Sequence, residues 1–148
     1  MTDDAITSQL VTWYFDDAIE FWHEKRMSRM EAWKYHEKLL MEGNIITLAD
    51  GNTLCGYVES LRLSFDQWGR IICGEPFSAY LEDVKSGPIA VCYNTYIRPE
   101  YRNTEVYRIL RNKFIELNKN CRYFAGEARR KRAGFIKVFK RQEILKEA

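Results

Sequence analysis

The sequence has few of the residues that would place it in a specialised class of protein. Its 148 residues include only eight glycines and three prolines, which excludes collagen-like and Pro/Gly-rich disordered chains. No apolar run approaches the roughly 18 residues that span a bilayer. The sequence begins Met-Thr-Asp-Asp, which is acidic where a secretory signal is basic. We therefore expect one cytoplasmic domain over residues 1–148, without membrane contact.

Histidine and closely spaced cysteine are also scarce. The four cysteines are Cys55, Cys73, Cys92 and Cys121, and the two histidines are His23 and His36. No two cysteines form the CxxC pair that zinc sites commonly use, and a nucleophilic cysteine needs a positioned histidine. We expect four reduced, mostly buried thiols, two partly exposed helical histidines, and no metal.

Positive charge is concentrated in the last third of the chain. Residues 98–148 carry 15 Lys and Arg against six Asp and Glu, whereas residues 1–97 carry eight against 15. A basic segment suits an anionic partner. The run Arg129, Arg130, Lys131 and Arg132 could therefore contact nucleic acid or the phosphate of a cofactor, or form a solvated face. These three alternatives stay open.

Hydrophobic periodicity predicts helices and strands in one mixed α/β domain. Asp50-Gly51-Asn52 separates two runs rich in β-formers, which predicts a hairpin. Residues 89–97 form a nearly continuous apolar run, so we expect them to be the central strand, flanked by 45–63 and 122–126. The expected helices cover 5–42 with a break near Lys25–Ser28 and an end at Gly43-Asn44, 76–85, 105–118 and 129–145. The expected strands cover 45–49, 53–63, 68–74, 89–97 and 122–126.

Three segments together resemble the GNAT superfamily of N-acetyltransferases. Residues 45–59, IITLADGNTLCGYVE, resemble its hairpin. Residues 91–110, VCYNTYIRPEYRNTEVYRIL, resemble the strand, Pro and Tyr-Arg steps and helix that grip acyl-CoA. Residues 122–143, RYFAGEARRKRAGFIKVFKRQE, resemble its next strand and helix. The resemblance implies an α+β fold, with a mixed, mostly antiparallel sheet flanked by helices over residues 44–148 and an N-terminal helical extension over 1–43.

The resemblance also implies where an acyl-CoA, most simply acetyl-CoA, would bind. A helix that starts near residue 105 offers free backbone N–H groups and a positive dipole to a pyrophosphate, and Asn103 or Thr104 can cap it. The superfamily has glycine at the positions of Glu105 and Tyr107, so this chain departs from the superfamily's glycine-rich cradle, the turn that binds the pyrophosphate. The implied cofactor-binding residues are Tyr96, Ile97, Arg102, Asn103, Thr104, Glu105, Val106, Tyr107 and Arg108.

No motif marks a catalytic residue. The superfamily commonly uses a tyrosine on its last helix to protonate the leaving thiolate, and Phe139 stands at that position here, without a proton to give. Candidates for a general base beside the central strands are Glu59 and Glu75, with Tyr93 as a polar substitute.

Three functions therefore remain open. The first is an acyl-CoA-dependent N-acyltransferase acting on an unknown amine. The second is a catalytically inactive binding or structural module with the same fold, of the kind that bacteriophages encode. The third is a nucleic-acid-binding protein that uses the basic C-terminal half. A homodimer, in which a partner chain completes the substrate side, stays open as well.

Overall fold

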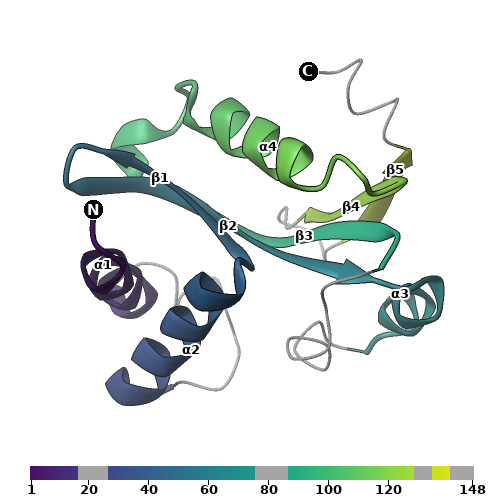
Figure 1. Ribbon diagram of the computed structural model, residues 1–148, viewed down its shortest axis with the longest axis horizontal. Coiled ribbons are helices and arrows are strands. Elements are labelled where there is room, and N and C mark those ends of the chain that lie inside the picture. The colour runs from purple at the N-terminus through teal and green to yellow at the C-terminus, as the bar shows by residue number, and fades with distance from the viewer. Residues whose placement is uncertain (17–26, 76–86, 129–134, 141–148) are drawn as a thin grey trace.

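The computed structural model describes residues 1–16, 27–75, 87–128 and 135–140 (Figure 1). The described strands form one five-stranded sheet in the order β1-β2-β3-β4-β5, antiparallel except for the parallel pair β3 and β4. In chain order the elements are α1 (Asp3–Asp16), α2 (Arg29–Glu42), β1 (Ile45–Asp50), β2 (Thr53–Leu63), α3 (Phe65–Ile72), β3 (Ile89–Ile97), the 3-10 turn η3 (Pro99–Tyr101), α4 (Val106–Leu117), β4 (Tyr123–Ala128) and β5 (Phe135–Lys140).

The helix α2 begins and ends where the local signals place it. The Ser28 side chain accepts a hydrogen bond from the Glu31 N–H and so caps α2. Gly43 ends α2 in the left-handed region at φ 71°. The expected break between two helices is confirmed, while His23 and the rest of residues 17–26 lie outside the described residues.

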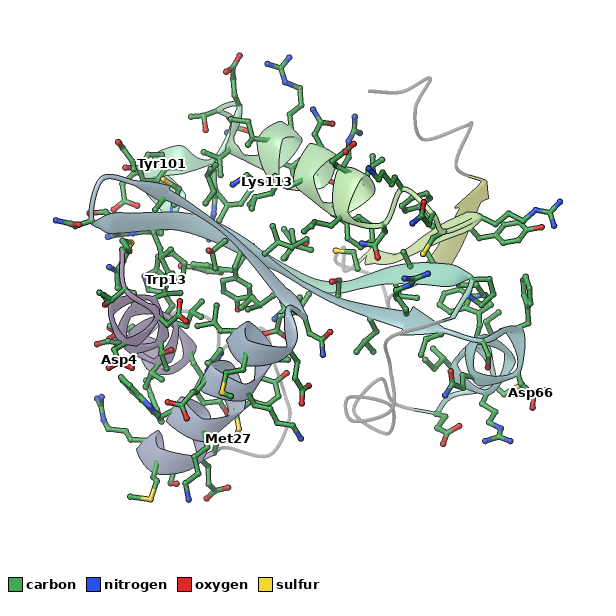
Figure 2. The ribbon with its side chains drawn as sticks, viewed as in Figure 1. Asp4, Trp13, Met27, Asp66, Tyr101 and Lys113 are labelled. Carbon is green, nitrogen blue, oxygen red and sulfur yellow. The ribbon has the colours of Figure 1, made fainter. Side chains whose placement is uncertain are left out.

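The sheet has helices on both faces (Figure 1). On one face α4 packs over the middle strands, around Val58, Leu110, Phe114 and Phe124. On the other face α1 and α2 cover one end of the sheet, and Trp13 lies between α1 and the strands (Figure 2). At the other end of that face α3 buries Trp68 and Ile71. The expected α+β architecture, with residues 89–97 as the central strand, is confirmed.

The strand expected at 68–74 is wrong, because residues 65–72 form α3. The Ser64 side chain accepts from the Gln67 N–H, and the Gln67 side chain accepts from the Ser64 N–H, which is a complete capping box. The Ser-x-x-Gln spacing is present in the sequence and outweighs the β-formers Ile71 and Ile72. Gly69 is accommodated on the exposed side of this helix.

The helix expected at 129–145 is also wrong in its described part. Residues 135–140 form β5, which pairs antiparallel with β4, so that Phe139 lies opposite Phe124. Phe139 is therefore on a strand and does not take the place of a helical tyrosine. The basic residues 129–132, the segment 141–148 and the helix expected at 76–85 lie outside the described residues.

Helical periodicity predicts that Val106, Ile109, Leu110, Phe114 and Leu117 form the apolar face of the helix at 105–118. This apolar face is confirmed at Val106, Leu110 and Phe114. It is wrong at Leu117, which is 67% exposed, and at Ile109, which is 36% exposed, because the helix turns Ile115 into the core instead. Within the described residues, no helix has the length and apolarity to cross a membrane, and no group of His, Cys, Asp or Glu is placed to hold a metal.

Gly56 permits the close approach of β2 to β3. A Cβ at this position would lie 2.7 Å from the Tyr96 carbonyl oxygen and 3.2 Å from side-chain atoms of Ile97 and Leu110. We predict that Gly56→Ala lowers the free energy of unfolding by about 1–3 kcal/mol, as overpacking does. Urea denaturation followed by circular dichroism measures this change.

Gly69→Ala is the matched control, since a Cβ there meets nothing within 4 Å. In the interior of α3 this substitution should raise stability by about 0.5–1 kcal/mol. Equal effects of the two substitutions would show that the contact between Gly56 and β3 is not tight.

Candidate functional site

The central strand β3 contains an extra residue at Tyr93. Glu59 of β2 lies opposite Asn94, and the next residue, Ser60, lies opposite Cys92, so Tyr93 has no counterpart. This is a β-bulge, which bends the strand and changes the direction of the side chains beyond it. Val91 faces the α3 side of the sheet and Cys92 faces α4, whereas Tyr96 faces α1 and Ile97 faces α4.

Beyond the bulge, β3 separates from β4. The parallel pairing joins Ile89–Cys92 to Tyr123–Gly126 and stops there, although β3 continues to Ile97. The Arg98 N–H donates to the Cys55 carbonyl, so the backbone of residue 98 faces β2. Because backbone groups alternate along a strand, those of Thr95 and Ile97 face away from β2, on the side where β4 has parted. Among the described residues, no strand pairs with this edge.

The open edge leads directly into the turn before α4. Asn103 adopts a positive φ of 61°, which asparagine tolerates better than most residues. The Thr104 hydroxyl donates to the Tyr101 carbonyl and accepts from the Val106 N–H at 3.4 Å. The N-cap residue of α4 is Glu105, and its side chain makes no capping hydrogen bond. The cap expected at Asn103 or Thr104 is therefore placed too early, although Thr104 does accept from the Val106 N–H.

The two residues at the superfamily's glycine positions lie on the surface. The Glu105 carboxylate forms an ion pair with Arg108 at 2.7 Å, so its negative charge is partly compensated at the helix N-terminus. Tyr107 is 55% exposed. Their side chains therefore add bulk and charge on the outer surface of the turn and do not pack beneath it.

Arg102 lies at the junction of the open edge and the turn. Its Nε–H donates to the Ile97 carbonyl oxygen at 2.9 Å, and its guanidinium lies 5.8 Å from the centre of the Tyr96 ring. In the turn between residues 98 and 108, Arg98 is paired with Glu100 and Arg108 with Glu105. Arg102 has no such carboxylate partner among the described residues, so its charge is available to an anion.

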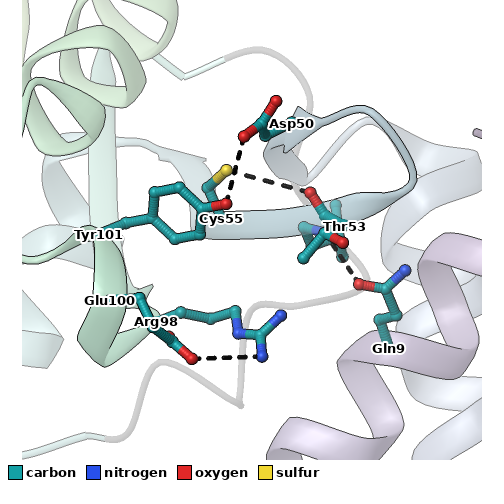
Figure 3. A network of polar contacts seen from close by, with 8 residues as sticks. Gln9, Asp50, Thr53, Cys55, Arg98, Glu100 and Tyr101 are labelled. Carbon is teal, nitrogen blue, oxygen red and sulfur yellow. Dashed lines mark hydrogen bonds and ion pairs between the residues drawn. The ribbon is translucent and has the colours of Figure 1, made fainter.

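A separate network fixes this turn against the rest of the sheet (Figure 3). The Tyr101 hydroxyl donates to Asp50 at the tip of the β1–β2 hairpin, at 3.3 Å. A hydrogen bond with Cys55 is the main cause that raises the pKa of Tyr101, and burial and Asp50 add to it. Arg98 also stacks over Trp13 of α1 at 5.7 Å. The turn is thus attached to both the hairpin and the N-terminal helix.

A buried polar cluster lies under the bulge, on the face that α1 and α2 cover. Glu59 is only 3% exposed and accepts a hydrogen bond from the Tyr35 hydroxyl at 3.1 Å. Asn94 donates to the Tyr57 hydroxyl at 3.4 Å. Burial, followed by the nearby Glu59 carboxylate, raises the pKa of Tyr57 well above its usual value. Tyr57 therefore stays protonated.

The structure brings some of the predicted residues together and not others. Glu59 lies beside the bulge, and Tyr93 is the extra residue itself, although only its backbone is described. Glu75 follows α3, which lies where β3 begins, so it is at the other end of the strand from the open edge. Tyr96, Ile97 and the turn of residues 102–108 adjoin one another as expected.

Tyr35, Tyr57 and Asn94 were not predicted as site residues. Asn94 lies next to the bulge, and no residue type in the sequence indicates a bulge; Tyr35 and Tyr57 reach the cluster from α2 and β2 through tertiary packing. Cys92, the last residue before it, is a poor nucleophile, because burial raises the pKa of its thiol to about 11. The four cysteines are free: Cys55 and Cys121 are buried, Cys92 is partly so, and Cys73 is exposed.

Comparisons with known proteins identify the fold. No protein-family model matches the sequence, and no curated protein matches it significantly. Among solved structures, the chain is similar to ribosomal-protein-alanine N-acetyltransferase from Brucella melitensis, with a TM-score of 0.55, 16% identity, and coverage of 86% of this chain and 70% of that one. It is also similar to PaiA N-acetyltransferase from Thermoplasma acidophilum in complex with coenzyme A, with a TM-score of 0.55, 13% identity and coverage of 93% and 92%.

A third similar structure has a different chemistry. It is the GphF GNAT-like decarboxylase in complex with isobutyryl-CoA, with a TM-score of 0.57 and 19% identity, and the match covers 86% of this chain and 61% of that one. The chain therefore has the fold of the GNAT superfamily in a divergent sequence, as the resemblance implied. Since proteins of this fold carry out more than one reaction, the function has to be argued from the site.

His36 lies next to the polar cluster and is only 2% exposed, so the expectation that it is partly exposed is wrong. Its ring packs edge-on against Tyr35 and Tyr14, and its Nδ1 is 2.7 Å from the Ala32 carbonyl oxygen. Burial lowers the pKa of His36 below 6.5, although the bond to Ala32 opposes this shift. The folded protein thus favours the neutral imidazole.

We predict that this histidine makes the free energy of unfolding depend on pH. The contribution of His36 to the free energy of unfolding is complete above about pH 6.5, the pKa of histidine in an unfolded chain. This contribution declines as the pH falls toward the lower pKa of His36 in the folded protein, because the unfolded state then binds more protons. Urea titrations of wild type and His36→Gln between about pH 7.5 and about pH 5 measure the difference. A wild type that loses no more stability than the variant contradicts the prediction.

Proposed function

We propose that this protein binds an acyl-CoA along the open edge of β3 and transfers the acyl group to an amine. The observation that carries the proposal is the bulge at Tyr93 with the parting of β3 from β4. It leaves the backbone groups of Thr95 and Ile97 without a strand partner among the described residues. The coenzyme-A-bound structures of the same fold support this choice of ligand.

The pantetheine arm of coenzyme A has the chemistry that an open strand edge needs. It is an extended chain with two amide groups, so it can pair with backbone N–H and C=O groups as an added strand does. Pairing at Thr95 and Ile97 would therefore position the thioester near the bulge.

The phosphates would lie at the start of α4. Backbone N–H groups and the helix dipole favour an anion there, and Arg102 provides a charge that no carboxylate holds among the described residues. Glu105 and Tyr107 replace the glycines of the superfamily, so the backbone is less accessible. We expect binding at this turn to depend more on arginine and less on the backbone than in a glycine-rich cradle.

In the proposed reaction the amine nitrogen attacks the thioester carbonyl. A C–N bond forms, the C–S bond breaks, coenzyme A leaves as a thiolate that takes a proton from solvent, and the amine loses a proton. Glu59 is the candidate to take this proton, because it lies under the bulge on the face that α1 and α2 cover. The Tyr35 hydroxyl, which donates to Glu59, orients the carboxylate.

Calorimetry with acetyl-CoA and with desulfo-CoA tests the ligand. We expect both to bind, since they share the pantetheine and the phosphates. If neither heat change nor displacement is detected at millimolar ligand, coenzyme A does not bind this protein. Binding without acyl transfer to any of a panel of amines would favour the inactive binding module.

Glu105 gives a graded test of the phosphate position. Glu105→Gln removes the negative charge, and Glu105→Gly also opens the backbone, so we predict tighter acetyl-CoA binding in that order. The first step should gain about 2–5-fold, as loss of an exposed like charge near a helix N-terminus would allow. Glu116→Gln, which changes a comparable exposed carboxylate near the other end of α4, should leave the affinity unchanged.

Glu59→Gln tests the proton acceptor. The substitution preserves the shape of the side chain and can still accept from Tyr35, so acetyl-CoA should bind as in wild type. Transfer should fall about 10²–10⁴-fold, the usual contribution of a general base, and the acidic limb of the pH–rate profile, where a general base becomes protonated, should change with it. If transfer by the variant keeps the wild-type rate and pH profile, Glu59 is not the base.

A further inference from the structure

Arg102 holds a position that the proposed ligand needs. Its Nε–H donates to the Ile97 carbonyl oxygen at 2.9 Å, and that oxygen is on the open side of β3. The Arg98 N–H donates to Cys55 across β2, and backbone direction alternates from residue to residue. The carbonyl that Arg102 occupies is therefore one of the groups that an added strand would use.

Several contacts hold the guanidinium there. It lies over the Tyr96 ring, with its carbon 5.8 Å from the ring centre, within the range of a cation–π interaction. Tyr96 is itself buried against Trp13 and Tyr57, so its ring is a fixed platform. Arg102 thus has a defined resting position, although its side chain is exposed to solvent.

The same arginine is next to the anion site. It lies four residues before Val106, the first residue of α4, and in the turn of residues 98–108 it is the described arginine without a carboxylate partner. A guanidinium has five N–H donors and pairs well with phosphate. A change of its side-chain rotamer would exchange the Ile97 carbonyl for an oxyanion bound at the helix start.

We propose that Arg102 is a specificity residue that exchanges the Ile97 carbonyl for a phosphate of the ligand. This inference rests on the proposed function. A pantetheine N–H that pairs with the Ile97 carbonyl would compete with the Arg102 Nε–H, which donates to the same oxygen on the open side of β3. A ligand with a phosphate gives the displaced guanidinium a new partner, whereas a ligand without one does not. The exchange makes the site select phosphorylated pantetheine thioesters over smaller thioesters.

The proposal predicts opposite effects of one substitution on two ligands. In Arg102→Ala, acetyl-CoA should bind roughly tenfold more weakly, because a charge-assisted contact to phosphate is lost. S-acetyl-pantetheine, which has no phosphate, should bind roughly threefold more tightly, because nothing competes for the Ile97 carbonyl. Titrations followed by NMR measure both affinities, including weak ones.

Two further variants make the test specific. Arg102→Met keeps a long side chain over Tyr96 but has no hydrogen-bond donor. It should therefore also bind acetyl-CoA more weakly and S-acetyl-pantetheine more tightly, which would show that a lost contact with Tyr96 is not the cause. Arg70→Ala removes an exposed, ion-paired arginine from α3 at the other end of the sheet. It should change neither affinity, and thermal unfolding confirms that each variant is folded.

The outcomes separate the inference from the function on which it rests. If wild type does not bind acetyl-CoA, the proposed function is wrong and the inference falls with it. If wild type binds acetyl-CoA and the Arg102 variants lose only that affinity, Arg102 is a simple phosphate ligand and the exchange is refuted. If the variants weaken both ligands equally, Arg102 has a structural role, which also refutes it.

Discussion

The extra residue at Tyr93 ends the pairing of β3 with β4, and the proposed site depends on this interruption. A regular β3 could continue its pairing with β4 past Gly126 to Ala128, where β4 ends. With the bulge, the first half of β3 is an ordinary central strand, while the second half has one edge bonded to β2 and one edge open among the described residues. The open edge offers the backbone groups of Thr95 and Ile97 to a strand-like ligand.

The surrounding structure keeps this interruption in place. Gly56 lets β2 approach β3 closely just beyond the bulge, and the hydrogen bond from Tyr101 to Asp50 joins the turn before α4 to the β1–β2 hairpin. Trp13 packs against Tyr57 and Tyr96 from α1. These contacts attach the open edge of β3 and the turn before α4 to the rest of the sheet.

Much of the fold could be predicted, because it depends on local signals. The Asp50-Gly51 turn, the Gly43 helix end and the apolar run at 89–97 each specify an element by themselves. The prediction failed where two local signals compete, as at Ser64–Ile72, and where tertiary pairing outweighs helical periodicity, as at 135–140. The site was predicted in part: the turn before α4 has a recognisable sequence, whereas the bulge and the Tyr35–Glu59 contact exist only in three dimensions.

Hydrogen exchange at single amides of β3, followed by NMR with and without acetyl-CoA, tests the central claim most directly. The account predicts that the amides of Thr95 and Ile97 exchange rapidly in the free protein and become protected when acetyl-CoA is added. The amide of Tyr96, which faces β2, should be protected in both states. If Thr95 and Ile97 are already protected without ligand, or stay unprotected at saturating acetyl-CoA, the open edge of β3 is not where the ligand binds.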